Sequence, residues 1–169
     1  MMKYMGCIVA LVLALPAFAA IPAKKAVAPK ILSGTGETFG GLAGTGFTLL
    51  DVRKTADKSK KIERVVFDIG DMAGAKMRGW PGYFHAELKN KPQRLVLSFS
   101  QMPNSHLDGM TLANRMKDSL AVKNTALSLD PVDSSLNLSF DLKPNTKVRV
   151  YQVAGKKATS KVVIDLMTE

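Results

Sequence analysis

Cysteine is nearly absent from this chain, since its 169 residues include one, Cys7. Cys7 lies inside the N-terminal apolar run rather than after it, which is not where a lipoprotein carries its cysteine. Removal of that run leaves no cysteine, which excludes a small cystine-stabilised scaffold and thiol catalysis. A chain of this length holds itself together by a hydrophobic core and hydrogen bonds instead.

Long apolar runs are also lacking, apart from one at the N-terminus. Lys3 precedes an apolar stretch over 4–15 that is too short to span a bilayer, and Ala17-Phe18-Ala19 closes it. This arrangement predicts a secretory signal peptide over 1–19. An uncleaved anchor is the alternative, but no positively charged flank follows at once. We expect a periplasmic protein, with secretion or envelope association as alternatives, and no transmembrane segment in its mature form.

Acidic residues are few: the chain has 14 Asp and Glu against 24 Lys and Arg, a formal net charge of +10. A basic exported protein meets lipid head groups, teichoic or lipopolysaccharide phosphates, and peptidoglycan carboxylates. The charge therefore indicates contact with an anionic surface of the envelope, such as peptidoglycan or another anionic polymer, and we expect no nucleic acid as a partner. The apolar fraction of 46% is ordinary for one soluble domain.

Apolar periodicity is absent from the stretch after the signal peptide. Residues 20–46 are rich first in Ala, Pro and Lys and then in Gly. The glycines fit neither the dinucleotide-binding fingerprint nor a phosphate-binding P-loop. The composition therefore predicts a flexible tether over 20–46.

Short runs with period-two alternation fill the remainder, 47–169, and predict an all-β domain. Over 136–142 the apolar residues Leu136, Leu138 and Phe140 alternate with polar ones, which is typical of a strand with one face in water. Turn residues separate the runs. The predicted strands are 47–52, 63–69, 83–88, 94–99, 120–129, 136–142, 147–153 and 161–166.

One helical segment is expected in the connection 107–119. There Leu112, Met116 and Leu120 recur at a spacing of four residues, which places them on one face of a helix. Gly109 and the short apolar stripe argue against a long helix. The sequence predicts one short helix at this point.

The predicted strands also repeat along the chain. Three strands over 63–99 resemble three strands over 135–166 in length, order and pattern, and a further candidate strand precedes each set. Two similar β units that each expose one apolar face can bury those faces against each other. We therefore expect a β-sandwich made of the two units.

Three segments of the repeat carry a family resemblance: Arg64-Val-Val-Phe-Asp68, Pro92-Gln-Arg94-Leu-Val96 and Val162-Val-Ile-Asp165. In strand content, turn position and order they resemble the AMIN domain, the module found beside cell-wall amidases and pilus secretins. The resemblance covers 47–166. One position departs from the family pattern, because the usual Asp of the second segment's strand is Ser98.

The resemblance implies a β-sandwich in the cell envelope that binds peptidoglycan without catalysing a reaction. The alternative that it implies is a periplasmic accessory of an envelope machine, such as a pilus or secretin complex, that pairs through an edge strand. The sequence runs to Glu169, shortly after the last predicted strand. We therefore expect a stand-alone domain without an attached enzyme.

Catalytic and metal-binding signatures are missing from the sequence. His85 and Glu87 lie two apart on one face of a predicted strand, but no second cluster supplies further ligands, and His106 is distant in sequence. No nucleophile elbow, His-Glu-x-x-His motif or paired-carboxylate signature occurs. We expect neither an enzyme nor a cofactor or metal.

Two aromatic and cationic groupings are the candidate glycan-binding residues. Trp80, Arg78 and Tyr83 form the first, and Tyr151 with Arg149 forms the second. An aromatic ring can stack on a sugar, and a neighbouring guanidinium can pair with a carboxylate. The alternatives are that Trp80 closes one end of the sandwich and that the second pair lies on an ordinary solvated face.

Overall fold

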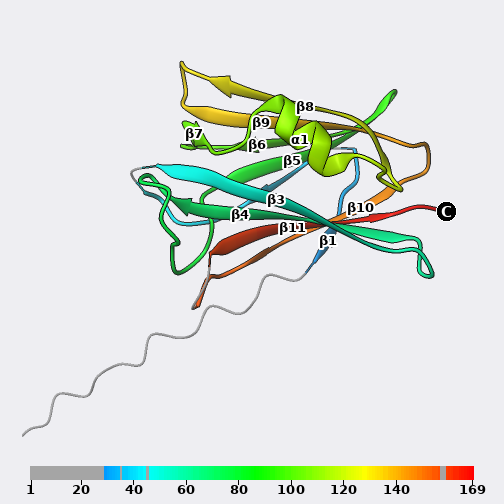
Figure 1. The fold of residues 1–169 in the computed structure, drawn as a ribbon, viewed down its shortest axis with the longest axis horizontal. Helices are drawn as coiled ribbons and strands as arrows, with labels where there is room; N and C mark the ends of the chain where they lie inside the picture. The colour runs from blue at the N-terminus through cyan, green and yellow to red at the C-terminus, as the bar shows by residue number, and fades with distance from the viewer. Residues whose placement is uncertain (1–28, 35, 45, 157–158) are drawn as a thin grey trace, which may run out of the picture.

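A computed structural model describes residues 29–34, 36–44, 46–156 and 159–169. In this part the chain is an all-β sandwich of two packed sheets with one short helix, which confirms the predicted fold class (Figure 1). The predicted signal peptide, 1–19, and residues 20–28 of the predicted tether lie outside the described residues. No helix in the described part is long and apolar enough to cross a membrane.

The six-stranded sheet, here sheet A, has the order β1-β10-β11-β4-β3-β7, and the five-stranded sheet B has the order β2-β5-β6-β9-β8. All neighbours are antiparallel except β3 and β7. The strands are β1 (Lys30–Ile31), β2 (Glu37–Phe39), β3 (Phe47–Asp57), β4 (Ile62–Asp71), β5 (Phe84–Asn90), β6 (Gln93–Phe99), β7 (Asn104–Ser105), β8 (Val122–Asp130), β9 (Ser135–Leu142), β10 (Lys147–Val153) and β11 (Ser160–Met167).

The prediction of a flexible tether over 20–46 is wrong for Lys30–Ile31 and Glu37–Phe39, which form strands. Strand β1 pairs with β10, and strand β2 pairs with β5. Leu32 and Phe39 are buried in the core, and the Phe39 ring stacks on Phe84 with centroids 4.6 Å apart. These strands are two and three residues long, which is too short to show a period of two. They form because they hydrogen-bond to the edges of the longer strands β10 and β5.

The two sequence units are not the two layers of the sandwich, which corrects the expected arrangement. The first unit places β3 and β4 in sheet A and β5 and β6 in sheet B, whereas the second places β8 and β9 in sheet B and β10 and β11 in sheet A. Strands β3, β4, β5 and β6 of the first unit thus match β8, β9, β10 and β11 of the second. With this matching, the order β3-β4-β11-β10 in sheet A repeats as β8-β9-β6-β5 in sheet B. Each unit straddles both sheets, and a pseudo-two-fold axis relates the two units.

Local details repeat with the same symmetry. The register of β3 shifts between Leu49 and Asp51, and that of β8 shifts between Val122 and Asn124, so both first strands carry a bulge near their start. Phe67 of β4 and Phe140 of β9 occupy matching positions, and their rings meet edge to face with centroids 6.0 Å apart. The core therefore centres on the contact between the two units.

Helix α1 (Gly109–Met116) confirms the short helix expected in 107–119. Asp108 caps its N-terminus by accepting a hydrogen bond from the Thr111 N–H at 2.7 Å. Leu112 and Met116 are buried, as their spacing predicts. The helix packs against β8 and β3, on the side of the sandwich where the β7 margin of sheet A and the β8 margin of sheet B lie (Figure 1).

Asp68 forms one of two matched cross-strand ion pairs that join the units: its carboxylate bonds Lys161 at 2.6 Å in sheet A, as Asp141 bonds Arg94 in sheet B. Burial opposes ionisation of Asp68, but hydrogen bonds from Lys161 and Thr159, together with the charges of Lys161 and Arg53, lower its pKa below the usual 3.8.

This lowered pKa predicts an acid-dependent contribution to stability. The ionised Asp68 stabilises the fold fully above about pH 4, and the contribution disappears as the pH falls through the lower pKa of the folded state. We expect Asp68→Asn to lower the free energy of unfolding by about 1–2 kcal/mol at pH 7, with a smaller difference at about pH 2.5. Urea denaturation at both pH values measures it, and an equal difference at both would contradict the assignment.

Candidate functional site

The outer face of sheet A carries the second predicted grouping. Alternation along β4, β10 and β11 directs Arg64, Arg149 and Asp165 away from the core, and the strand register aligns these three in one row across the sheet. The next row holds Tyr151 beside two valines, Val163 and Val66. We call the surface formed by Arg64, Arg149, Tyr151 and Asp165 the Arg–Tyr face.

Asp165 organises the Arg–Tyr face. Its side chain is 3% exposed, and it accepts hydrogen bonds from Arg64 Nε at 2.7 Å and Arg64 Nη2 at 3.1 Å. Arg149 Nε lies 3.5 Å from Oδ2, the carboxylate oxygen that also accepts the bond from Arg64 Nη2. The hydrogen bonds to Asp165 raise the pKa of Arg64 above its usual value. Asp165 thus orients the Arg64 guanidinium by two hydrogen bonds and forms an ion pair with Arg149, whose buried Nε has no hydrogen-bond partner within the described chain. Two guanidiniums to one carboxylate leave the face with an excess of positive charge.

Tyr151 provides the aromatic surface of this face. The Arg64 guanidinium lies over its ring, with the guanidinium carbon 5.8 Å from the ring centroid, in cation–π geometry. Burial and the negative charge of Asp165 raise the pKa of the Tyr151 phenol. The phenol therefore stays neutral and able to donate a hydrogen bond at physiological pH.

The Arg–Tyr face remains open to a ligand. The Arg64 side chain is 51% exposed even though its carboxylate partner is buried, and Tyr151 is half-buried. A tyrosine ring beside a guanidinium offers an aromatic surface with cationic donors next to it. The arrangement can therefore recognise a sugar ring that carries, or lies near, a carboxylate.

The first predicted grouping lies in the segment between β4 and β5. Trp80 is half-buried, while Arg78 and Tyr83 are exposed. The backbones of Gly79 and Gly155 exchange two hydrogen bonds, of 2.8 and 2.7 Å. This pairing places Trp80 near the end of β10, the strand that carries Arg149 and Tyr151. In the described part no ion pair or hydrogen bond joins the three residues of the grouping to one another.

The histidines occupy ordinary surface positions. His85 Nδ1 lies 2.9 Å from Thr38 Oγ1 on the outer face of sheet B, where Glu87 faces the same way. The Glu87 Oε2 atom lies 3.9 Å from the Lys89 Nζ atom, which is close to the longest distance of an ion pair. Among the described residues, no three His, Cys, Asp or Glu side chains gather in a group that can hold a metal ion.

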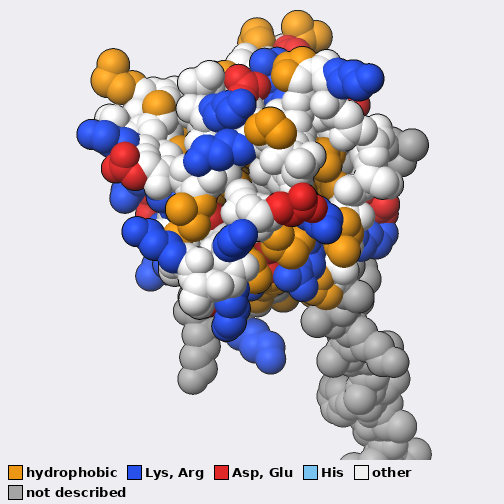
Figure 2. Space-filling view, turned by 90° about the vertical axis from the view of Figure 1, so that its right-hand side faces the viewer, with side chains coloured by type: hydrophobic (Ala, Val, Ile, Leu, Met, Phe, Trp, Pro, Cys, Tyr) orange, Lys and Arg blue, Asp and Glu red, His pale blue; other side chains and the backbone are white. Residues whose placement is uncertain are grey.

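One end of the sandwich is rich in lysine. The turn between β3 and β4 holds Lys58, Lys60 and Lys61, and Lys91 and Lys143 occupy two other turns at this end. Figure 2 shows these turns end-on, with Lys and Arg side chains spread over the surface and fewer acidic ones between them. On β10, Lys147 precedes Arg149 by two residues and faces the same way, so the Arg–Tyr face continues into this basic end.

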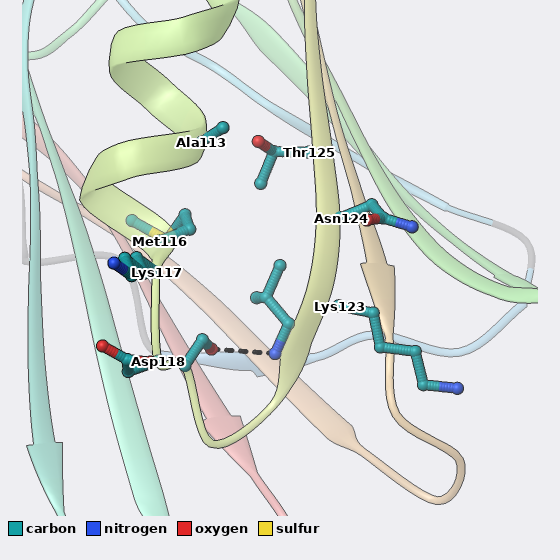
Figure 3. A pocket seen from close by; sticks show the side chains of 9 residues that line it. Ala113, Met116, Lys117, Asp118, Lys123, Asn124 and Thr125 are labelled. Atoms are coloured by element: carbon teal, nitrogen blue, oxygen red, sulfur yellow. Dashed lines mark hydrogen bonds between the residues drawn. The ribbon is translucent and has the colours of Figure 1, made fainter.

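A groove of about 370 Å³ lies between α1 and β8, lined by residues that include Met116, Val122 and Thr125. In Figure 3 the Thr125 side chain points from β8 toward α1, while Lys123 and Asn124 point away from the helix. The Thr125 hydroxyl is buried, and no described residue hydrogen-bonds it. The groove holds none of the residues predicted to bind a glycan.

Sequence reasoning missed Arg64 and Asp165 as site residues. Both lie in the segments that carry the family resemblance, and the alternation of β4 already assigns Arg64 to the wet face. The contact between them joins residues 101 positions apart, so it depends on the pairing of β4 with β11. Arg149 and Tyr151, predicted together, do share one face and lie beside this contact.

Comparison with known proteins adds no relative. No family model matches the chain, and no curated protein matches it either. The AMIN resemblance therefore stays a prediction.

Proposed function

We propose that the protein is an exported, non-catalytic module of the cell envelope that binds peptidoglycan through the Arg–Tyr face. One observation carries the proposal: buried Asp165 holds Arg64 over the ring of Tyr151 and forms an ion pair with Arg149 on the same face. Peptidoglycan offers sugar rings for stacking and peptide carboxylates for pairing with guanidinium groups. The face supplies a partner for each.

The charge distribution supports the same ligand. The Arg–Tyr face has two guanidiniums to one carboxylate, and it adjoins the lysine-rich end of the sandwich. A long anionic polymer can contact both surfaces, because the lysines attract it over a distance and the ordered arginines fix its position. The AMIN resemblance, which rests on segments containing Arg64 and Asp165, supports an envelope location.

Sacculus co-sedimentation tests the proposal. We expect Arg64→Ala and Tyr151→Ala each to weaken binding about five- to tenfold, because each removes part of the stacked pair. Arg94→Ala is the matched control, since it removes the corresponding kind of cross-strand arginine from the outer face of sheet B. Trp80→Ala tests the neighbouring segment.

Two results would contradict the proposal. One is equal binding by Arg64→Ala and Arg94→Ala, which indicates that only total charge matters. The other is complete loss of wild-type binding at moderate salt, because screening weakens exposed charges but leaves stacking in place. In that case the protein behaves as a general polycation.

A second candidate function is that of a periplasmic accessory in a pilus or secretin complex. The observation that favours it is a sheet margin without a covering strand, on β8. Crosslinking in intact cells, followed by identification of the attached proteins, tests this candidate. Recovery of no envelope protein would reject it.

A further inference from the structure

Strand β8 is the one long strand that forms a sheet margin in the described part of the chain. At the other three margins a short strand pairs with two or three residues of the long one: β1 with β10, β7 with β3, and β2 with β5. No described backbone group hydrogen-bonds the outer edge of β8. At its start the Val122 N–H donates to the Ser119 hydroxyl, and α1 lies beside Val122, across the groove. The other N–H and C=O groups of this edge form a template for another strand.

The sequence of β8 does little to block such pairing. Between Lys123 and Asp130 the residues Asn124-Thr-Ala-Leu-Ser-Leu129 carry no charge and no proline. Natural edge strands commonly use charges, proline or bulges along their length to prevent pairing, whereas the bulge of β8 lies at its start. Leu129 and Val132 are 47% and 93% exposed near its other end.

We propose that β8 pairs antiparallel with β8 of a second copy of this chain. The charges select this occupant and direction, because Lys123 and Asp130 lie at opposite ends of the uncharged stretch. Antiparallel pairing centred on Ala126 or Leu127 brings Lys123 within one residue of the partner's Asp130, at both ends of the interface. Parallel pairing places like charges together instead.

The side chains on β8 fit the same arrangement. Thr125, Leu127 and Leu129 face inward, since their register partners are the core residues of β9. If the two copies are related by a two-fold axis normal to sheet B, the inward-facing side chains of both β8 strands lie on the same face of the joined sheet. Leu127 and Leu129 then gain apolar neighbours from the partner. The groove between α1 and β8 opens beside Thr125 and provides space for the partner's inward side chains (Figure 3).

The pairing makes sheet B continuous across two copies and turns both Arg–Tyr faces to the same side. A polymer with repeating units can then engage two faces at once, which raises its apparent affinity. This consequence for binding rests on the proposed function. The pairing itself does not, because it is read from β8 alone.

Sedimentation velocity of the mature chain over a range of concentrations tests the pairing. We expect a dimer, and we expect Ala126→Lys to raise its dissociation constant at least tenfold, because two copies of the lysine face each other near the axis. Ser139→Lys is the matched control, since Ser139 is the register partner of Ala126 on the neighbouring strand and faces the same way. It should dimerise like the wild type.

A charge exchange identifies the partner strand. Lys123→Asp and Asp130→Lys should each weaken the dimer, and the double variant should restore it. A monomer at every concentration would overturn the proposal, whatever the sacculus result, and would leave the edge to a strand of another protein. A dimer that Ala126→Lys does not weaken, or that the double variant does not restore, would also overturn it.

Discussion

Replacing Phe140 with alanine is expected to lower the free energy of unfolding by about 3–5 kcal/mol. The Phe140 side chain is 2% exposed on the inner face of β9, and its ring meets that of Phe67 at the centre of the core. Alanine removes this contact and leaves a cavity between the two sequence units, which the facing sheets can fill only in part. The variant should therefore lose stability through both the lost burial and the cavity.

Ser139→Ala is the control for this prediction. Ser139 neighbours Phe140 on β9 but faces outward, so its replacement should change the stability by less than about 0.5 kcal/mol. Urea denaturation of both variants with equal slopes measures the difference. Equal losses would mean that the alternation of β9, and with it the packing of the two sheets, is assigned incorrectly.

Glu63→Ala is expected to cost about 2–3 kcal/mol and to loosen α1. Glu63 is 1% exposed at the start of β4, where its carboxylate accepts hydrogen bonds from the Ser119 hydroxyl and, at 2.7 Å, from the Leu120 N–H. Ser119 in turn accepts the Val122 N–H at the start of β8. Alanine removes the acceptor that ties the segment between α1 and β8 to sheet A.

Hydrogen–deuterium exchange combined with urea denaturation measures this effect. We expect faster exchange in α1 and at the start of β8, with sheet B otherwise unchanged. Glu87→Ala is the control, because Glu87 lies on the outer face of β5 near a single lysine, and we expect a change below about 0.5 kcal/mol. Unchanged exchange in α1 would show that Glu63 does not anchor the segment.

The strand content and the helix were predictable because each shows in local spacing. Strand β9 alternates over its whole length, and Leu112 and Met116 recur at helical spacing in α1. Such patterns arise wherever one face of an element is buried and the other is wet. They report which side of an element faces the core, but not which element lies opposite.

The remaining features depend on partners that are distant in the sequence. Strands β1 and β2 are too short to show a period, and they exist because β10 and β5 offer open margins. The division of each unit between two sheets depends on the crossing segments between β4 and β5 and between β9 and β10. Local spacing carries no information on either feature.

The candidate site was predictable in part for the same reason. Arg149 and Tyr151 lie two apart on one strand, so their common face follows from the period of two. Arg64 and Asp165 enter the site only through the register of β4 with β11. The sequence therefore identified the aromatic ring and one cation but neither the second cation, Arg64, nor the carboxylate that pairs with both guanidiniums.

The most direct test of ligand binding by the Arg–Tyr face is an NMR titration of the protein without residues 1–19, using soluble peptidoglycan fragments that keep both the sugars and the peptide carboxylates. We expect chemical-shift changes that cluster at Arg64, Arg149 and Tyr151 on the outer face of sheet A, with few on the outer face of sheet B. Changes confined to the lysine-rich turns, or no changes at all, would contradict it.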